Sequence, residues 1–476
     1  MTTLSSSKPS LPEAVLPQSA AALVDEAIAS GDVHCAAAVY ELAGGKQQDV
    51  LRGMMFDRRR DVLMLARWEH TPAAVLRALC ESSDDFVRLR LGRNQNTPVQ
   101  ALVGKEQPGA NADLTGLIAQ HQNAPSDLLQ HLAEADEDDE HLKSICRNQA
   151  ADAAVLQSLS ARKPGDFERE MVGNPNVSAA MLEAIYRSGD AYLRAAAAGH
   201  ANCPLALMQE AMADQDVLVQ RQLAKDARMP AEALKRLAAD ADTAVRAAVA
   251  ANPAMPAELQ ATLARDEAVA VRRALAARTD LAVRLMEQMS TDKDDWVRQW
   301  LGRNPALPQS LMRQLADDKV DDVRRAVARN PQCPLALLRH LANDRSDWVR
   351  AAVAYQRNAD GALMRELAAD TDIDVLSGVA ANANTAVSLM MKLARHEEAD
   401  VRRGVILNPQ ATRLILLPLL EDPYYLHRLM LVGQPQLTAE DKWRLHDDPD
   451  YRVRFSVFSW FARTFAPAKS KAGPKK

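Results

Sequence analysis

Apolar and polar positions along the chain recur with a period of 26 residues. One aliphatic residue marks each period, and the most regular of these anchors are Leu193, Val219, Val245, Val271, Val297, Val323, Val349, Val375 and Val401. The series continues at spacings of 25 to 28 through Val62, Val87, Leu114, Leu142 and Phe167 upstream, and through Leu426 and Val453 downstream. A fixed period of this length indicates stacked copies of one small structural unit.

Each unit is predicted to contain two short helices. In 323–327 the apolar residues fall at i, i+3 and i+4, which places them on one face of a helix. Asn330 ends that helix and caps the turn, because Pro331 cannot continue it. Pro334 suits the first turn of a second helix, whose apolar stripe follows over 338–342.

An acid precedes the anchor in most units. It can cap the helix and favourably meet the positive end of its dipole. The acids that the sequence assigns to this role are Asp321, Asp322, Asp347, Asp374 and Asp400.

Such a unit cannot be stable alone. Helices of about eight to ten residues do not persist in water, and fewer than about 40 residues cannot enclose a core. Each unit must therefore bury its apolar stripe against its neighbours. The sequence predicts an all-α fold, an α-solenoid of about sixteen two-helix repeats.

The pattern V-R-x-A-V-A-x-N-P-x-x-P-x-x-L-x-x-L-A-x-D, seen at 323–344, resembles the leucine-rich repeat variant family, a bacterial family of HEAT-like repeats. The resemblance covers roughly 62–460 and is best over 193–409. It implies a right-handed superhelix of alternating short helices, one of which can be a 3₁₀ helix. The unit here is slightly longer than the family's usual one. The cysteine cluster that binds an iron–sulfur centre in the founding member has no counterpart, so that cofactor is not carried over.

The domain organisation follows from this periodicity. We expect a disordered leader over 1–19, rich in Ser and Pro, and an N-terminal helical cap over 20–60. The repeat solenoid is predicted over 61–465, and a disordered basic tail over 466–476.

Composition and charge narrow the class of protein. Hydrophobic residues make up 47% and charged residues 25%, as in soluble folded proteins, and the net charge of −5 disfavours a chain that coats itself in phosphate. Neither a signal peptide nor an apolar run long enough for a membrane span is evident. The five cysteines are dispersed, which predicts reduced thiols in a cytoplasmic protein without metal or cofactor.

The most regular polar feature is an arginine that follows the anchor. It occurs as Arg88, Arg194, Arg246, Arg272, Arg298, Arg324, Arg350, Arg402 and Arg454. The column could bind an anionic polymer, or each arginine could pair with an acid between repeats. Because acids lie within three residues of most of these arginines, we favour structural pairing.

A partner site is better sought where the repeat is broken. The candidate partner-binding residues are Trp296, Trp300, Trp348, Arg350, Tyr355 and Arg357. Exposed Trp, Tyr and Arg contribute most to interface energies, whereas in the alternative these large side chains fill gaps between mismatched repeats.

No motif of catalysis appears in the sequence: no nucleophile elbow, glycine-rich phosphate loop or zinc-protease motif. We therefore predict a non-catalytic scaffold or adaptor that binds a protein partner through the solenoid surface. The alternative is a HEAT-like protein that binds nucleic acid or repairs DNA through its arginine column. No membrane partner is expected.

Overall fold

The computed structural model describes residues 15–103 and 112–466. This part of the chain contains 34 α-helices and three short 3₁₀ helices, and no strand occurs in it. The predicted all-α solenoid is confirmed. Most of the predicted leader, residues 1–14, and all but the first residue of the predicted tail, residues 467–476, lie outside the described residues.

The chain divides into two compact units, and unit 2 spans Thr97–Leu389. After α7 (Val99–Val103), unit 2 repeats a pair of helices, which we call the A helix and the B helix. The A helices are α8 (Ala112–Gln120), α10 (Asp139–Arg147), α12 (Glu168–Met171), α14 (Ala191–Ala198), α16 (Val217–Lys225), α18 (Thr243–Ala251), α20 (Val269–Ala276), α22 (Asp295–Arg303), α24 (Asp321–Ala328), α26 (Asp347–Ala354) and α28 (Ile373–Ala381).

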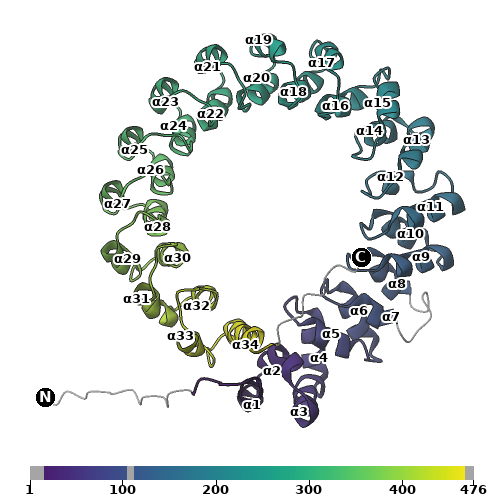
Figure 1. Cartoon of the computed structure of the whole chain (residues 1–476), viewed down its shortest axis with the longest axis vertical. Helices are drawn as coiled ribbons and strands as arrows, with labels where there is room; N and C mark the ends of the chain where they lie inside the picture. The colour runs from purple at the N-terminus through teal and green to yellow at the C-terminus, as the bar shows by residue number, and fades with distance from the viewer. Residues whose placement is uncertain (1–14, 104–111, 467–476) are drawn as a thin grey trace, which may run out of the picture. The chain divides into compact units, whose positions relative to one another are not determined.

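The B helices alternate with them. They are α9 (Ser126–Ala135), α11 (Ala153–Arg162), α13 (Ala179–Ser188), α15 (Leu205–Ala211), α17 (Ala231–Leu237), η2 (Ala257–Leu259) with α19 (Gln260–Leu263), α21 (Val283–Met289), α23 (Gln309–Ala316), α25 (Leu335–Leu341) and α27 (Gly361–Leu367). Within unit 2, the A helices from α14 to α28 form an inner row and the B helices an outer row (Figure 1). The A helices therefore line the concave side of this unit.

Unit 1 combines both ends of the chain, residues 15–96 and 390–466 among those described. Its N-terminal helices are α1 (Ala20–Ser30), α2 (Val33–Val39), η1 (Tyr40–Leu42), α3 (Gly45–Phe56), α4 (Arg59–Arg67), α5 (Ala73–Leu79) and α6 (Asp85–Arg93). Its C-terminal helices are α30 (Ala399–Leu407), α31 (Arg413–Leu416), η3 (Leu417–Glu421), α32 (Tyr425–Val432), α33 (Ala439–Trp443) and α34 (Tyr451–Phe465), and α29 (Val387–Leu393) crosses the boundary between the units.

In unit 1, α34 packs against α1 and α2, and Figure 1 shows α2 and α34 side by side. The contact is rich in aromatic rings: His34 stacks on Tyr451, and Phe455 meets the edge of Trp68. The N-terminal helical pair and the last helix therefore cover each other's apolar faces.

The helices begin close to the predicted positions, but the capping residues differ. Asp321 and Asp347 are the first residues of their helices, and Asp374 lies in the first turn of α28, so they face the helix dipole without capping. The side-chain caps lie earlier, as in Asp294, whose carboxylate accepts a hydrogen bond from the amide of Val297. The prediction of caps at those acids was therefore wrong by one or two residues.

The core is the column of anchors. Every anchor from Val219 to Val401 is fully buried, and burying one such side chain stabilises the fold by roughly 1.5–3 kcal/mol. Neighbouring A helices approach closely, since a Cβ atom at Gly302 of α22 would lie 3.2 Å from the Cβ of Ala326 in α24. Successive copies of the repeat therefore share one continuous core.

Candidate partner-binding site

The arginine column is a structural feature. The Nε and Nη2 atoms of Arg272 donate hydrogen bonds to the two carboxylate oxygens of Asp292, at 2.7 and 3.0 Å. Its Nη1 donates to the carbonyl of Asp266, at 2.8 Å. Arg272 therefore joins its own repeat to the acid that begins the next one, and other arginines of the column pair in the same way with the acid 20 residues further on.

We call this series the arginine–aspartate ladder. Its members are Arg194–Asp214, Arg246–Asp266, Arg272–Asp292, Arg298–Asp318, Arg324–Asp344 and Arg350–Asp370 in unit 2, and Arg402–Asp422 and Arg428–Asp448 in unit 1. Most of these side chains are buried or nearly so. The guanidinium groups are therefore engaged within the protein, which agrees with structural pairing.

Electrostatics within the ladder reflect the pairing. Burial alone would raise the pKa of Asp318, but the hydrogen bonds from Arg298 and from the amide of Val320, with the nearby charge of Arg298, together outweigh it and hold this pKa below its usual range. The hydrogen bond to Asp318 in turn raises the pKa of Arg298. Both groups are charged at neutral pH, and the paired geometry stabilises the charged forms.

Arg350 belongs to this ladder, although the sequence suggested it for the partner surface. Its Nε donates to the carboxylate of Asp370 at 2.6 Å and its Nη1 to the carbonyl of Asp344 at 2.9 Å. The structure therefore assigns Arg350 to the stacking of repeats and not to the open surface.

The asparagines of the Asn-Pro motif act between repeats as well as within their own turn. The Nδ2 atom of Asn330 donates to the carbonyls of Gly302 and Asn304 in the preceding repeat, both at 2.8 Å. Its Oδ1 accepts from the amide of Gln332, which is the predicted turn role. The bonds to the preceding repeat were not predicted, since only the fold reveals which carbonyls lie nearby.

Gln356 replaces the asparagine of this column. Its Nε2 donates to the carbonyls of Ala328 and Asn330, both at 2.9 Å, so the longer amide keeps both bonds. Its neighbours Tyr355 and Arg357 are exposed. This break in the repeat is thus conservative at Gln356 and alters the surface on either side.

The three tryptophans lie on A helices of unit 2. Trp296 and Trp300 belong to α22 and Trp348 to α26, and their exposed fractions are 51%, 40% and 58%. Tyr355, at the end of α26, is 55% exposed. Side chains this exposed do not fill gaps in the core, so the structure leaves them on the surface.

An arginine of the preceding A helix lies over each of two of these rings. The guanidinium carbon of Arg273 lies 5.2 Å from the ring centre of Trp296, and that of Arg325 lies 4.8 Å from the ring centre of Trp348. Contacts of this kind contribute roughly 0.5–1 kcal/mol at exposed sites. They hold the rings in fixed positions and so reduce the entropy lost on binding a partner.

Basic residues that the sequence analysis did not select lie on α22 and α24, and one of them, Arg325, lies over the ring of Trp348. Arg303, Arg325 and Arg329 lie on α22, on α24 and at the end of α24, and we call them the arginine cluster. Desolvation, followed by the charges of Arg325 and Arg303, lowers the pKa of Arg329. We define the A-helix face as the exposed sides of α22, α24 and α26, which carry the tryptophans and this cluster.

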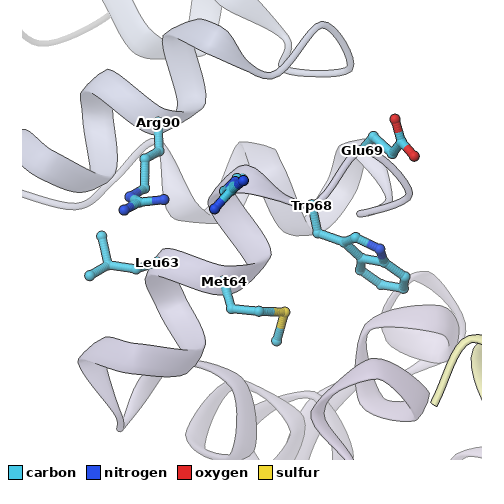
Figure 2. Close-up of a pocket in the computed structure, with 6 residues that line it drawn as sticks. Leu63, Met64, Trp68, Glu69 and Arg90 are labelled. Carbon is cyan, nitrogen blue, oxygen red and sulfur yellow. The ribbon is translucent and has the colours of Figure 1, made fainter. Parts of the chain in front are cut away.

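A second feature lies in unit 1, between α4 and α6. A hollow of about 540 Å³ is lined by Leu63, Met64, Arg67, Trp68, Glu69 and Arg90. Figure 2 shows the side chains of Arg90 and Leu63 pointing toward one another across it. Arg67, Arg90 and Trp68 all line this hollow, and the sequence analysis singled out none of them.

The described residues contain neither a candidate metal site nor a membrane-spanning helix. Within 15–103 and 112–466, no three His, Cys, Asp or Glu side chains are grouped so that they could hold a metal ion. In the same residues, no helix combines the length and the apolar character needed to cross a bilayer.

Comparison with known proteins identifies the repeat. A model of the leucine rich repeat variant family matches residues 321–346, which contain α24 and α25. The unit at 321–346 is similar to a leucine-rich repeat variant. One leucine-rich repeat variant unit thus corresponds to one A helix, one B helix and the turn that leads to the next A helix.

Among solved structures, the chain is similar to a leucine-rich repeat variant with a novel repetitive protein structural motif. The two are 24% identical, and the match covers 52% of this chain and 88% of that one with a TM-score of 0.31. No curated protein matches the sequence.

Proposed function

We propose that this protein is a non-catalytic scaffold that binds a protein partner through the A-helix face. The observation that supports it most is the exposure of Trp296, Trp300 and Trp348 on the inner-row helices α22 and α26, on either side of α24, together with that of Tyr355 and Arg357. Tryptophan, tyrosine and arginine are the residue types that contribute most binding energy at protein interfaces. A solenoid supplies an extended surface on which such residues lie in register.

A nucleic-acid function that uses the arginine column has less support. That function needs guanidinium groups free to meet phosphates, whereas Arg272, Arg298 and Arg324 each donate to a carboxylate of the next repeat. Extracting one of them would leave a buried aspartate without its partner, which costs about 3–5 kcal/mol.

The experiment is capture of partners from the native cell with the full chain as bait. The Trp300→Ala/Trp348→Ala double variant should lose the specific partners because it removes the largest exposed rings of the A-helix face. Val283→Ala is the matched control, since Val283 is an exposed apolar residue on the B helix α21. Circular dichroism checks that helicity is unchanged, and partners retained equally by the double variant would refute the proposal.

A further inference from the structure

One three-residue arrangement occurs four times in the described chain. An arginine lies over an aromatic ring of a later helix, two residues after the residue in the N-cap position of that helix. The four copies are Arg59, Asp84 and Phe86; Arg169, Asp190 and Tyr192; Arg273, Asp294 and Trp296; and Arg325, Ser346 and Trp348.

In three copies the capping residue is an aspartate that pairs with the arginine. The Nε of Arg273 donates to one carboxylate oxygen of Asp294 at 3.1 Å, and its Nη2 donates to the other at 3.0 Å. Arg59 pairs with Asp84, with 2.7 Å between Nε and Oδ2, and Arg169 pairs with Asp190. The arginine over the aromatic ring is thus normally neutralised.

The fourth copy lacks the acid. Ser346 caps α26 in the position that Asp294 occupies for α22, and its hydroxyl lies 3.3 Å from Oδ2 of Asp321. The Nε of Arg325 is buried and has no hydrogen-bond partner. The nearest acidic contact is Oδ1 of Asp322, 3.8 Å from Nη1, which is beyond hydrogen-bonding distance.

The surroundings of Arg325 add positive charge. Arg303 and Arg329 are exposed, and in 15–103 and 112–466 no acidic side chain forms an ion pair with either. Three guanidinium groups therefore lie on or at the end of two adjacent A helices, α22 and α24, and that of Arg325 lies over the ring of Trp348 on α26. A partly desolvated guanidinium that forms no hydrogen bond to an acid binds carboxylate or phosphate strongly, because charge-assisted bonds are the strongest available to it.

Resting on the proposed function, we infer that an acidic segment of the partner protein docks on the A-helix face and that one of its carboxylates pairs with Arg325. That carboxylate takes the place of the aspartate missing at Ser346. Further carboxylates of the segment meet Arg303 and Arg329, and its apolar side chains lie against Trp348 and Tyr355.

A peptide fits this surface better than a nucleic acid does. The exposed acids Asp321, Asp322 and Asp374 lie at the starts of α24 and α28, close to the cluster along the same row. A polymer with a phosphate at every step would meet these acids as well as the arginines. A peptide can place carboxylates at the arginines and uncharged residues at the acids.

The span from Arg303 on α22 to Trp348 on α26 sets the length of the segment. Three adjacent A helices at about 10 Å spacing extend over roughly 20–30 Å, which an extended peptide of about ten residues covers. A random peptide library of about this length, displayed on phage, is therefore a suitable probe for selection on the full chain.

The test measures binding of the selected peptides to the full chain and to three variants. Arg325→Gln should weaken binding about tenfold or more, in keeping with a lost charge-assisted pair. Ser346→Asp should weaken it similarly without unfolding the chain, because the new carboxylate restores the arrangement of Asp294 and neutralises Arg325. Arg313→Gln, on the B helix α23, is the matched control and should leave affinity unchanged.

The outcomes separate the inference from the proposed function. Selected peptides rich in Asp and Glu, with loss in both Arg325→Gln and Ser346→Asp, support the inference. Peptides without acidic enrichment, or full affinity in Ser346→Asp, overturn it. Displacement of the peptide by oligouridine, with the same dependence on Arg325, would overturn the assignment to a protein partner. If Ser346→Asp still captures partners that Trp300→Ala/Trp348→Ala loses, the inference fails while the proposed function stands.

Discussion

Arg454 donates a 2.8 Å hydrogen bond from Nε to the carboxylate of Asp32, although the two lie 422 residues apart. Every other arginine in the ladder pairs with an acid 20 residues further along the chain. Asp32 supplies that acid for the last helix, and it also caps α2 through the amide of His34. Burial would raise the pKa of Asp32, but bonds from His34 and Arg454 hold it well below its usual range.

Removing this pair should destabilise unit 1. Arg454→Gln leaves the carboxylate of Asp32 largely buried without its cation, which costs about 3 kcal/mol. Denaturant unfolding should show this loss, and hydrogen exchange should become faster in both α2 and α34. Arg463→Gln, at an exposed position of α34, is the control and should change stability by less than about 0.5 kcal/mol. Equal stability of the two variants would contradict the role of the pair.

The ion pair of Arg324 with Asp344, in the middle of the ladder, should contribute as much to stability as that of Arg454 with Asp32. Arg324→Gln leaves Asp344 without its cation in a buried position, so we expect a loss of about 3 kcal/mol in the free energy of unfolding. Arg313→Gln serves as the comparison because Arg313 is exposed on α23. Should Arg324→Gln prove no more harmful than Arg313→Gln, the ladder would not be a structural element.

Stability should depend on pH on the acidic side. Hydrogen bonds from arginines lower the pKa of Asp266 and Asp370, and the bond from Arg413 lowers the pKa of Asp441 to about 2. An acid whose pKa is lower in the folded state stabilises the fold above its unfolded pKa of about 3.9, and this contribution is lost as pH falls through the folded value. The thermal midpoint should be level above about pH 5 and fall steeply between about pH 4 and 2. A midpoint that stays level down to pH 2 would contradict these pairings.

Replacing Gly378 by alanine should destabilise the protein, although alanine normally favours a helix more than glycine does. A Cβ atom there would lie 2.7 Å from the Cβ of Ala354 and 3.0 Å from the ring of Tyr355. Gly378→Ala should therefore cost about 1–3 kcal/mol through overpacking. Gly53→Ala in α3, where the new Cβ would meet only an Asp57 oxygen at 3.6 Å, should instead stabilise by about 0.5–1 kcal/mol. Thermal unfolding distinguishes the two, and a stabilising Gly378→Ala would show that α26 and α28 are not closely packed.

The sequence was sufficient to predict the repeat and its helices, because the apolar residues in 323–327 and 338–342 alternate with prolines in a fixed phase. It misplaced the caps, since Asp321 and Asp294 differ by only one residue in their distance from the anchor. It could not reveal the bonds of Asn330 or the partner of Arg454, because these depend on which repeats touch.

The arginine cluster was also missed, although its signal is in the sequence. Ser346 stands where the copies at Asp190 and Asp294 carry an acid, two residues before an aromatic ring. The serine at 346 can be recognised as the loss of an arginine's partner only once the pairing of Arg273 with Asp294 is known. Those two residues are 21 apart in the sequence, and no local pattern joins them.

The most direct test of binding through the A-helix face is photo-crosslinking in the native cell. A benzoylphenylalanine at position 300, in place of Trp300 on α22, should yield a discrete crosslinked partner that mass spectrometry identifies. The same group in place of Arg313 on the B helix α23 should yield none. A partner that crosslinks equally from both positions, or from Arg313 alone, would contradict the account.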